Sequence, residues 1–260
     1  ITDNSTLKNM RRIFFAGLGL VLTACQPTAA VITPTATYTL APSPSATVEW
    51  FPPTSTTEVL PTSQPPPTLP VSMELGDVIF RDDFTDPEGW TVPQTETGGI
   101  NIGNGEANII INESRAFLVG TLEKPDLTDF YAEITVRPIL CAGRDEYGFL
   151  FRVIGRSQYY RYAISCDGEV RLDKIAPGSG MILYPWTRSA SVPPGAPSVS
   201  KIAVLAEEGQ LHLFINGEYQ TSVSDQQLQV GSFGIFARSA GDSAVTVSFS
   251  DLVVRDVIQK

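Results

Sequence analysis

The fold is decided by residues 146–173, which read EYGFLFRVIGRSQYYRYAISCDGEVRLD. Two turn signals divide this stretch into three runs whose large apolar residues recur at every second position, the period of a β-strand. Gly155-Arg156 predicts a two-residue turn of the type that begins with glycine. Cys166-Asp167-Gly168 predicts a three-residue loop with its glycine in the left-handed region. We therefore expect three consecutive antiparallel strands.

The two turns independently predict the same buried face. The expected cross-strand pairs are Phe151–Tyr160, Phe149–Tyr162, Tyr147–Ile164, Ile164–Val170 and Tyr162–Leu172. Opposed aromatic and branched side chains stabilise one another across antiparallel strands, so this face is expected to form an aromatic core.

The opposite face of these strands carries the candidate ligand-binding residues. Arg152, Tyr159 and Arg161 lie on it, and the register sets Arg161 opposite Asp173 on the third strand. A solvated, salt-bridged surface is one interpretation. The other is a sugar-binding face, because an exposed tyrosine stacks on sugar C–H groups while arginine and aspartate bond hydroxyls. Trp186 is a stacking platform in the second interpretation and a core or loop anchor in the first.

Short β-rich runs separated by Gly, Pro, Asn or Asp continue through residues 76–260, and no helical period of useful length appears. The runs lie near 78–84, 106–112, 116–121, 129–137, 146–154, 158–165, 169–175, 181–189, 200–206, 210–215, 218–223, 231–238 and 244–255. Regularly spaced short strands predict an all-β, two-sheet antiparallel sandwich, and the length suffices for one core.

Residues 1–24 are expected to be a signal peptide, with residues 1–9 upstream of the true start at Met10. Arg11-Arg12 precede an apolar run over 13–22. This run is too short to span a bilayer, and a charged segment followed by a short apolar one is typical of export signals.

The next segment predicts a membrane anchor and a spacer. Leu22-Thr-Ala-Cys25 resembles the bacterial lipobox at each of its four positions, which implies that Cys25 is lipidated and follows the cleavage site. Residues 25–75 are rich in Pro, Thr and Ser, a composition that cannot bury enough apolar surface to fold and predicts an extended, disordered linker. We therefore expect an exported chain, lipid-anchored at the cell surface or the outer face of a membrane.

The net charge bears on nucleic-acid binding, and the cysteine content bears on the compartment and on disulfide formation. The net charge is −10, and no basic stripe offsets it, which argues against nucleic-acid binding. If Cys25 is lipidated, an even pair of cysteines remains, as is typical of an oxidising compartment. The expected register sets Cys166 opposite Asp145 and close to Cys141, so a Cys141–Cys166 disulfide is predicted.

Several short motifs together resemble a known superfamily. They are Phe80-Arg-Asp-Asp-Phe84, Gly89-Trp90, Phe149-Leu-Phe-Arg152, Tyr159-Tyr-Arg-Tyr162, Asp167-Gly168, Asn216-Gly217, Gly231-Ser-Phe-Gly234 and Phe249-Ser-Asp-Leu-Val-Val254. Over residues 76–258 the set is similar to concanavalin A-like lectin/glucanase domains, in particular the laminin-G-like and 3-keto-disaccharide hydrolase types. The resemblance implies a jelly-roll sandwich whose concave sheet binds saccharide, with Arg152 on that sheet.

The sequence departs from the catalytic members of that superfamily. The glucanases carry Glu-x-Asp-x-x-Glu on a central strand, where paired carboxylates serve as acid and nucleophile, and this string does not occur here. The keto-sugar hydrolase type has acidic and amide residues at the positions of Arg161 and Ala163. These departures argue against transferring catalysis to this chain.

The acidic residues near the two ends of the domain and the single histidine are further candidates for sites. Asp82, Asp83 and Asp251 could hold structural Ca²⁺ through hard oxygens if the first and last strands pair, and ordinary turn capping is the alternative. His212 is the single histidine and is expected to be an exposed strand residue, which leaves no basis for a serine–histidine triad or a zinc site.

These observations lead to three functional hypotheses. The first is a monomeric, surface-tethered module that binds a glycan without catalysis. The second is a scaffold domain of the laminin-G kind that binds an envelope protein, for which a flat apolar patch would be expected. The third is a glycoside-processing enzyme, which would need two carboxylates within about 5–10 Å in one cleft.

Overall fold

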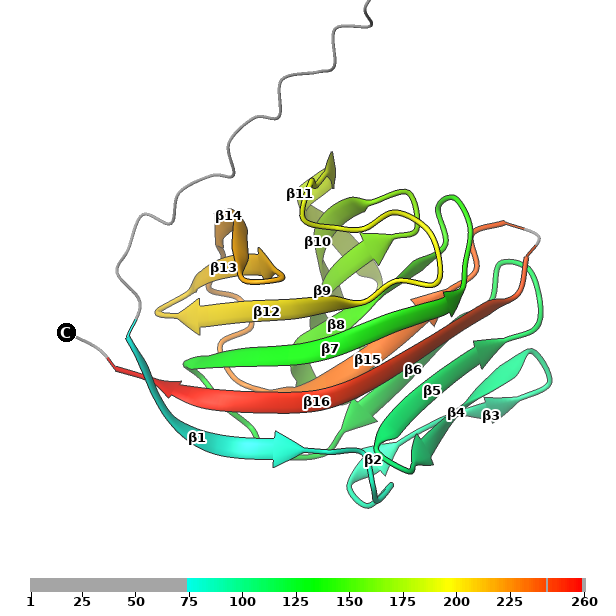
Figure 1. The fold of residues 1–260 in the computed structure, drawn as a ribbon. Helices are drawn as coiled ribbons and strands as arrows, with labels where there is room; N and C mark the ends of the chain where they lie inside the picture. Colours follow the sequence, from blue (N-terminus) through cyan, green and yellow to red (C-terminus); the bar gives the residue numbers. More distant parts are fainter. Residues whose placement is uncertain (1–73, 242, 259–260) are drawn as a thin grey trace, which may run out of the picture. The chain divides into compact units, whose positions relative to one another are not determined.

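The three strands expected between residues 146 and 173 lie in the middle of one sheet of a two-sheet sandwich (Figure 1). The computed structural model describes residues 74–241 and 243–258. The predicted signal peptide, the lipidation of Cys25 and all but the end of the predicted linker lie outside the described residues.

Both sheets are antiparallel, and the described residues contain no helix, hence none that could cross a bilayer. The nine-stranded sheet has the spatial order β14 (Glu218–Ser224), β13 (Gln210–Ile215), β12 (Ser200–Glu207), β7 (Phe130–Leu140), β16 (Val245–Val257), β5 (Glu106–Ile111), β4 (Gly98–Gly103) and β3 (Gln94–Thr95), with β1 (Leu75–Asp82) paired to β16. The seven-stranded sheet has the order β11 (Ser179–Arg188), β10 (Glu169–Ala176), β9 (Gln158–Ser165), β8 (Glu146–Ile154), β15 (Ser232–Arg238), β6 (Phe117–Leu122) and β2 (Trp90–Thr91).

Each run of residues expected from the sequence corresponds to a strand. The short strands β2, β3 and β4 were not predicted. Their segment, which reads TVPQTETGGINIG over residues 91–103, is rich in Thr and Gly and lacks the alternation of apolar and polar residues that identifies the other strands. At Gly98 a side chain would clash with the carbonyl oxygen of Ile110, so this edge of the sheet depends on close backbone contact.

The predicted register of the central strands is confirmed. Phe149 pairs with Tyr162 between β8 and β9, and Tyr162 pairs with Leu172 between β9 and β10. Gly168 adopts the left-handed conformation, with φ of 84°, as the three-residue loop requires. The buried face therefore lies where the two turn signals predicted it.

Aromatic side chains join the two sheets. Phe149 on β8 stacks on Phe233 of β15, with ring centroids 5.6 Å apart, and Phe130 from the nine-stranded sheet meets Phe233 edge-on at 5.0 Å. Phe149, Phe233 and Phe130 are all fully buried. Burial of each such ring contributes roughly 1.5–3 kcal/mol, so this cluster is a main source of cohesion between the layers.

The hairpin between β8 and β9 differs from the prediction in one respect, which changes the position of Arg152. Ile154 pairs with Gln158, so the turn contains three residues, and a β-bulge between Phe151 and Ile154 restores the expected pairing further along. At the bulge Arg152 has a positive φ of 49°, and its side chain is 1% exposed. The bulge thus rotates Arg152 off the face on which it was expected.

A disulfide joins Cys141, just after β7, to Cys166, at the end of β9, with Cα atoms 6.1 Å apart. The predicted pairing is therefore present. The amide of Cys166 donates to the carbonyl oxygen of Asp145 over 3.1 Å, which is the opposition that the register implied. The buried Asp145 carboxylate also accepts from the amides of Ala142 and Ala240, so one side chain organises the loops at this end of the sandwich.

Candidate functional site

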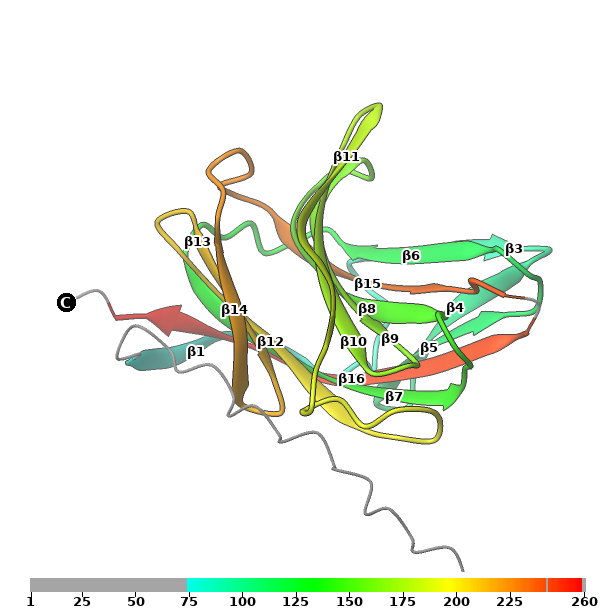
Figure 2. The same ribbon diagram turned by 90° about the horizontal axis from the view of Figure 1, so that it is seen from above.

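The face of the seven-stranded sheet that points away from the core is called here the outer face, and the sheet curls strongly from β6 to β11 (Figure 2). Its residues follow from the strand registers. Three successive rows across the sheet contain Ser165, Glu146, Arg238 and Phe117; then Arg171, Ala163, Gly148, Phe236 and Val119; then Asp173, Arg161, Leu150, Gly234 and Thr121.

The floor of the outer face is apolar and covered. Leu150, Ala163 and Phe236 are 0% exposed although they point away from the main core. They form a second apolar cluster with Tyr159 and Val153. Because small and apolar residues make the floor, the surface that a ligand could reach is formed by the longer side chains lying across it.

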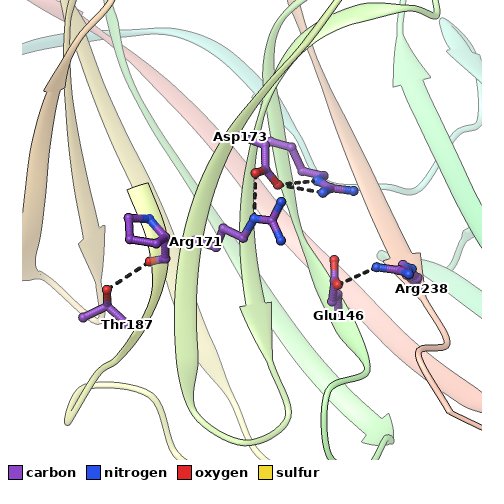
Figure 3. Close-up of polar contacts among 7 residues, drawn as sticks. Glu146, Arg171, Asp173, Thr187 and Arg238 are labelled. Atoms are coloured by element: carbon purple, nitrogen blue, oxygen red, sulfur yellow. Dashed lines mark hydrogen bonds and ion pairs between the residues drawn. The ribbon is translucent and has the colours of Figure 1, made fainter. Parts of the chain in front are cut away.

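A buried carboxylate holds two of these longer side chains. Asp173 on β10 has a side chain 2% exposed, and it accepts from Nε and an amino group of Arg161 at 3.1 and 2.6 Å (Figure 3). Its other oxygen accepts from Nε of Arg171 at 2.6 Å. The predicted opposition of Arg161 and Asp173 is present, and charge-assisted hydrogen bonds of this kind fix both the distance and the orientation of the guanidinium groups.

Each of the two arginines also lies against aromatic rings. The guanidinium carbon of Arg171 is 5.6 Å from the ring centroid of Trp186 on β11. That of Arg161 is 5.5 Å from Phe236 and 5.9 Å from Phe117. These separations are within the range of cation–π attraction. A continuous row therefore runs from Trp186 through the two arginines to Phe117, with Asp173 at its centre.

The sequence-predicted site residues divide into two groups. Arg161, Asp173 and Trp186 come together on the outer face, where Trp186 is half-buried. Tyr159 lies on the same face but is 6% exposed, because it packs in the apolar floor, so it is not the exposed stacking residue expected.

Arg152 does not lie on the outer face. Its guanidinium group donates to the carbonyl oxygens of Leu228 at 2.9 Å and Thr128 at 2.8 Å, which ties two loops to β8. Burial lowers the pKa of Arg152, and Tyr160 and Asp129 counteract part of that effect. Its role is structural, and the expectation that it contacts a ligand was wrong.

A second ion pair lies at the end of the outer face nearest the disulfide. Glu146 accepts from Arg238 at 2.8 Å through Oε1, and its Oε2 is buried without a hydrogen-bond partner among the described residues (Figure 3). Both oxygens of Asp173 are already taken by arginines. The buried carboxylates of this face therefore position arginines and do not present a free pair to a substrate.

A hollow of about 540 Å³ opens at the other end of the outer face. Thr121, Val153 and Ser232 line it, together with Arg156 from the β8–β9 turn. A smaller hollow of about 120 Å³ shares Thr91, Thr121 and Arg156. The sequence marked Arg156 only as a turn residue, because no local pattern shows that the bulged hairpin carries it over the sheet.

The predicted calcium site does not form. The first and last strands do pair, as that prediction required, with Asp82 opposite Leu252. However, Asp82 accepts from the amide of Phe84 and from the indole nitrogen of Trp90. Asp83 accepts from the hydroxyl and amide of Thr85, which lower its pKa, and Asp251 bonds its neighbour Ser250. Within the described residues no three acidic, cysteine or histidine side chains are grouped to hold a metal ion.

His212 lies on the far side of the sandwich from the outer face. The side chain was expected to be exposed but is buried, with 6% of its surface accessible. The reason is that β14 packs beside it, and its Nδ1 is hydrogen-bonded to the hydroxyl of Ser222. The same hydroxyl bonds the phenol of Tyr219. Burial lowers the pKa of His212, so its neutral form is the one suited to this position.

Comparison with solved structures identifies the fold. A carbohydrate-binding module from Bacillus subtilis superposes with a TM-score of 0.50 and 15% identity, over 65% of this chain and 96% of that chain. A Bacillus subtilis protein of unknown function with a galectin-like fold gives 0.54 and 13%, over 73% and 100%. The laminarinase catalytic domain from Thermotoga maritima gives 0.54 and 10%, over 72% and 100%.

The domain therefore has the concanavalin A-like jelly-roll fold that the sequence motifs implied. Neither a protein-family model nor a curated protein sequence matches the chain significantly. Because identities of 10–15% establish the fold alone, any function must be argued from the outer face itself.

Replacement of Asp173 by asparagine is expected to lower the free energy of unfolding by about 3 kcal/mol, because removal of one partner from a buried ion pair leaves the others uncompensated. Urea denaturation followed by tryptophan fluorescence measures the change. The matched control is Glu106→Gln, which breaks the exposed pair with Arg137 and should cost less than about 1 kcal/mol. Equal costs for the two variants would contradict the central role given to Asp173.

Acidification is expected to destabilise the domain through His212. The unfolded chain binds a proton near the ordinary histidine pKa of about 6.5, whereas burial lowers that pKa in the folded state. The contribution to stability is therefore complete above pH 6.5 and is lost as the pH falls through the lowered folded pKa. Urea midpoints measured between pH 5.5 and 7.5 should decline on acidification for the wild type and be flatter for His212→Gln.

Proposed function

We propose that this chain is an exported, lipid-anchored module whose β-sandwich binds carbohydrate on the outer face without catalysing a reaction. The observation that carries the proposal is the row in which Asp173 fixes Arg161 and Arg171 against aromatic rings. Rigid polar groups beside an aromatic surface are what a sugar needs, because each sugar ring has apolar C–H faces and a rim of hydroxyls.

Each part of the row has a role in this proposal. The half-buried Trp186 offers an indole face to the C–H groups of a sugar ring. Arg171 and Arg161 donate N–H groups to hydroxyl oxygens and lose little conformational entropy on binding, because Asp173 already holds them. The hollow beside Arg156 has a volume within the range of small-molecule sites and could receive a further sugar unit.

Binding without catalysis is favoured by the state of the carboxylates. A glycosidase needs one carboxyl group to protonate the leaving oxygen and another to attack or activate water. Asp173 has both oxygens bound to arginines, and Glu146 has one oxygen on Arg238 and the other buried. We therefore assign these side chains to the positioning of arginines.

A second candidate function is protein binding through β11. This strand is at the free edge of the seven-stranded sheet, and Met181 and Ile182 on it are 53% and 56% exposed. An exposed apolar edge can add a strand from a partner through main-chain hydrogen bonds. The patch is small, so we place this function second.

The lipid anchor follows from the Leu22-Thr-Ala-Cys25 motif and the composition of residues 25–75. An acyl-modified cysteine would hold the chain at the outer face of a membrane, and a Pro-rich segment would hold the binding domain away from it. This arrangement suits a module that captures glycans outside the cell.

Glycan binding is tested with the full chain carrying Cys25→Ser, which removes the expected lipid attachment point. We expect binding to at least one polysaccharide in a glycan array, and a weakening of about tenfold, or roughly 1.4 kcal/mol, in Trp186→Ala. Trp186→Phe keeps an aromatic ring and should retain most of the affinity. The same affinity in the wild type and in Trp186→Ala would exclude the outer face as the binding surface.

The anchor is tested by growing bacteria that express the full chain with an alkyne analogue of palmitate. The wild-type chain should incorporate the label and sediment with membranes, whereas Cys25→Ser should do neither, because the thioether has no attachment point. Label retained in Cys25→Ser would contradict lipidation at this residue.

A further inference from the structure

The outer face presents an excess of hydrogen-bond donors. A guanidinium group carries five N–H donors and no acceptor. Arg171 uses only its Nε on Asp173, and its terminal amino groups have no hydrogen-bond acceptor among the described residues. Arg161 donates through Nε and one amino group, and Arg238 through one amino group. Further N–H groups of all three arginines remain for a ligand.

Two of the three carboxylates of the same face are consumed or hidden, and the third, Glu169 on β10, lies at the end of the face opposite Arg188 on β11. Arginines occupy both oxygens of Asp173 and one oxygen of Glu146. The remaining oxygen of Glu146 has a solvent-accessible area too small for contact with a ligand at the surface. Figure 3 shows Arg171, Asp173, Glu146 and Arg238 on one side of the sheet. A ligand that lies over Arg161 and Arg171 therefore meets mainly donors.

The charge of this face also differs from that of the whole chain. The arginines of this face are Arg161, Arg171, Arg238 and Arg188, and its carboxylates are Asp173, Glu146 and Glu169, which is paired across the strands with Arg188. The face therefore has one positive charge in excess, whereas the chain carries a net −10. The local field is the more effective because the side chains of Arg161 and Arg171 are only 13% and 22% exposed and are screened weakly by solvent.

The positive charge is centred on these arginines and not on the hollow. Arg156 lines the hollow together with Glu123 and Asp126, and Asp126 is paired with Lys124. The hollow is therefore nearly neutral and suits an uncharged sugar unit, while the row suits an anionic one.

Building on the proposed function, we infer that the ligand is an acidic glycan, whose carboxylate or sulfate group is bound by the free N–H groups of Arg171 beside Arg161, while Arg238 on β15 adds positive charge to the same face. Guanidinium groups match the geometry of both oxyanions with paired hydrogen bonds. A neutral glycan would leave the donors of this row only partly used.

The test uses pairs of polysaccharides that share a backbone and differ in charge. The full chain with Cys25→Ser is titrated with polygalacturonate and with its methyl ester, and separately with κ-carrageenan and with desulfated κ-carrageenan. Isothermal titration calorimetry gives the dissociation constants. We expect at least one charged member to bind about tenfold or more tightly than its uncharged counterpart, since hydrogen bonds to charged groups have effects of this size. Preference within the first pair identifies a carboxylate, and preference within the second a sulfate.

The matched variants are Arg171→Ala and Arg137→Ala. Arg171→Ala leaves Asp173 paired with Arg161, so the fold should be retained, which circular dichroism and the thermal midpoint verify. It should weaken binding of the preferred charged polysaccharide about tenfold, the effect of losing a charge-assisted contact. Arg137→Ala removes the same charge from an exposed pair on the other sheet and should leave the affinity unchanged.

Each outcome separates this inference from the proposed function. Equal affinity for charged and uncharged members of both pairs would overturn the acidic ligand and leave carbohydrate binding intact. Failure to bind any polysaccharide, here or in the glycan array, would overturn both. Binding of polyglutamate as tight as that of the acidic polysaccharides would show attraction of any polyanion and would also overturn the inference.

Discussion

The contacts of Phe233 with Phe149 and Phe130 determine which side of the seven-stranded sheet faces the core. They join neighbouring strands β8 and β15 to β7 of the opposite sheet, so they fix which face of β8 is buried. Since side chains alternate along a strand, the outer face follows directly from that choice. A shift of one residue would place Leu150 and Arg161 inside and the aromatic rings in water, which the burial of three phenylalanines prevents.

The central register could be read from the sequence because two turn signals and one aromatic pattern agreed. That register also predicted the meeting of Arg161 and Asp173 correctly. Arg152 could not be placed, because no sequence pattern indicates the bulge beside it. One additional residue in the turn moves the Arg152 side chain to the opposite face of the sheet. Tyr159 and His212 were assigned to outward faces correctly but expected to be exposed, since alternation gives the side of a sheet and not what neighbouring strands cover.

The outer face is built as a second, smaller core with charged groups above it. Leu150, Ala163 and Phe236 form an apolar floor, and Arg161 lies over it with its charge neutralised in part by Asp173. A buried ion pair contributes little net stability, because desolvation offsets the attraction. Its value here is positional, since it keeps long and otherwise mobile side chains in one arrangement. The stable sheet thus holds the guanidinium groups in fixed positions before any ligand binds.

The free edge at β11 has a consequence for handling the protein at high concentration. The sheet order leaves β11 unpaired on one side, and its outer half, Ser179–Tyr184, carries no charged side chain to repel another strand. Pro185 lacks an amide donor and follows a break in register, so strand addition is confined to that outer half. Aggregation by sheet extension would therefore begin at this hairpin, and a lysine introduced at Met181 would protect it.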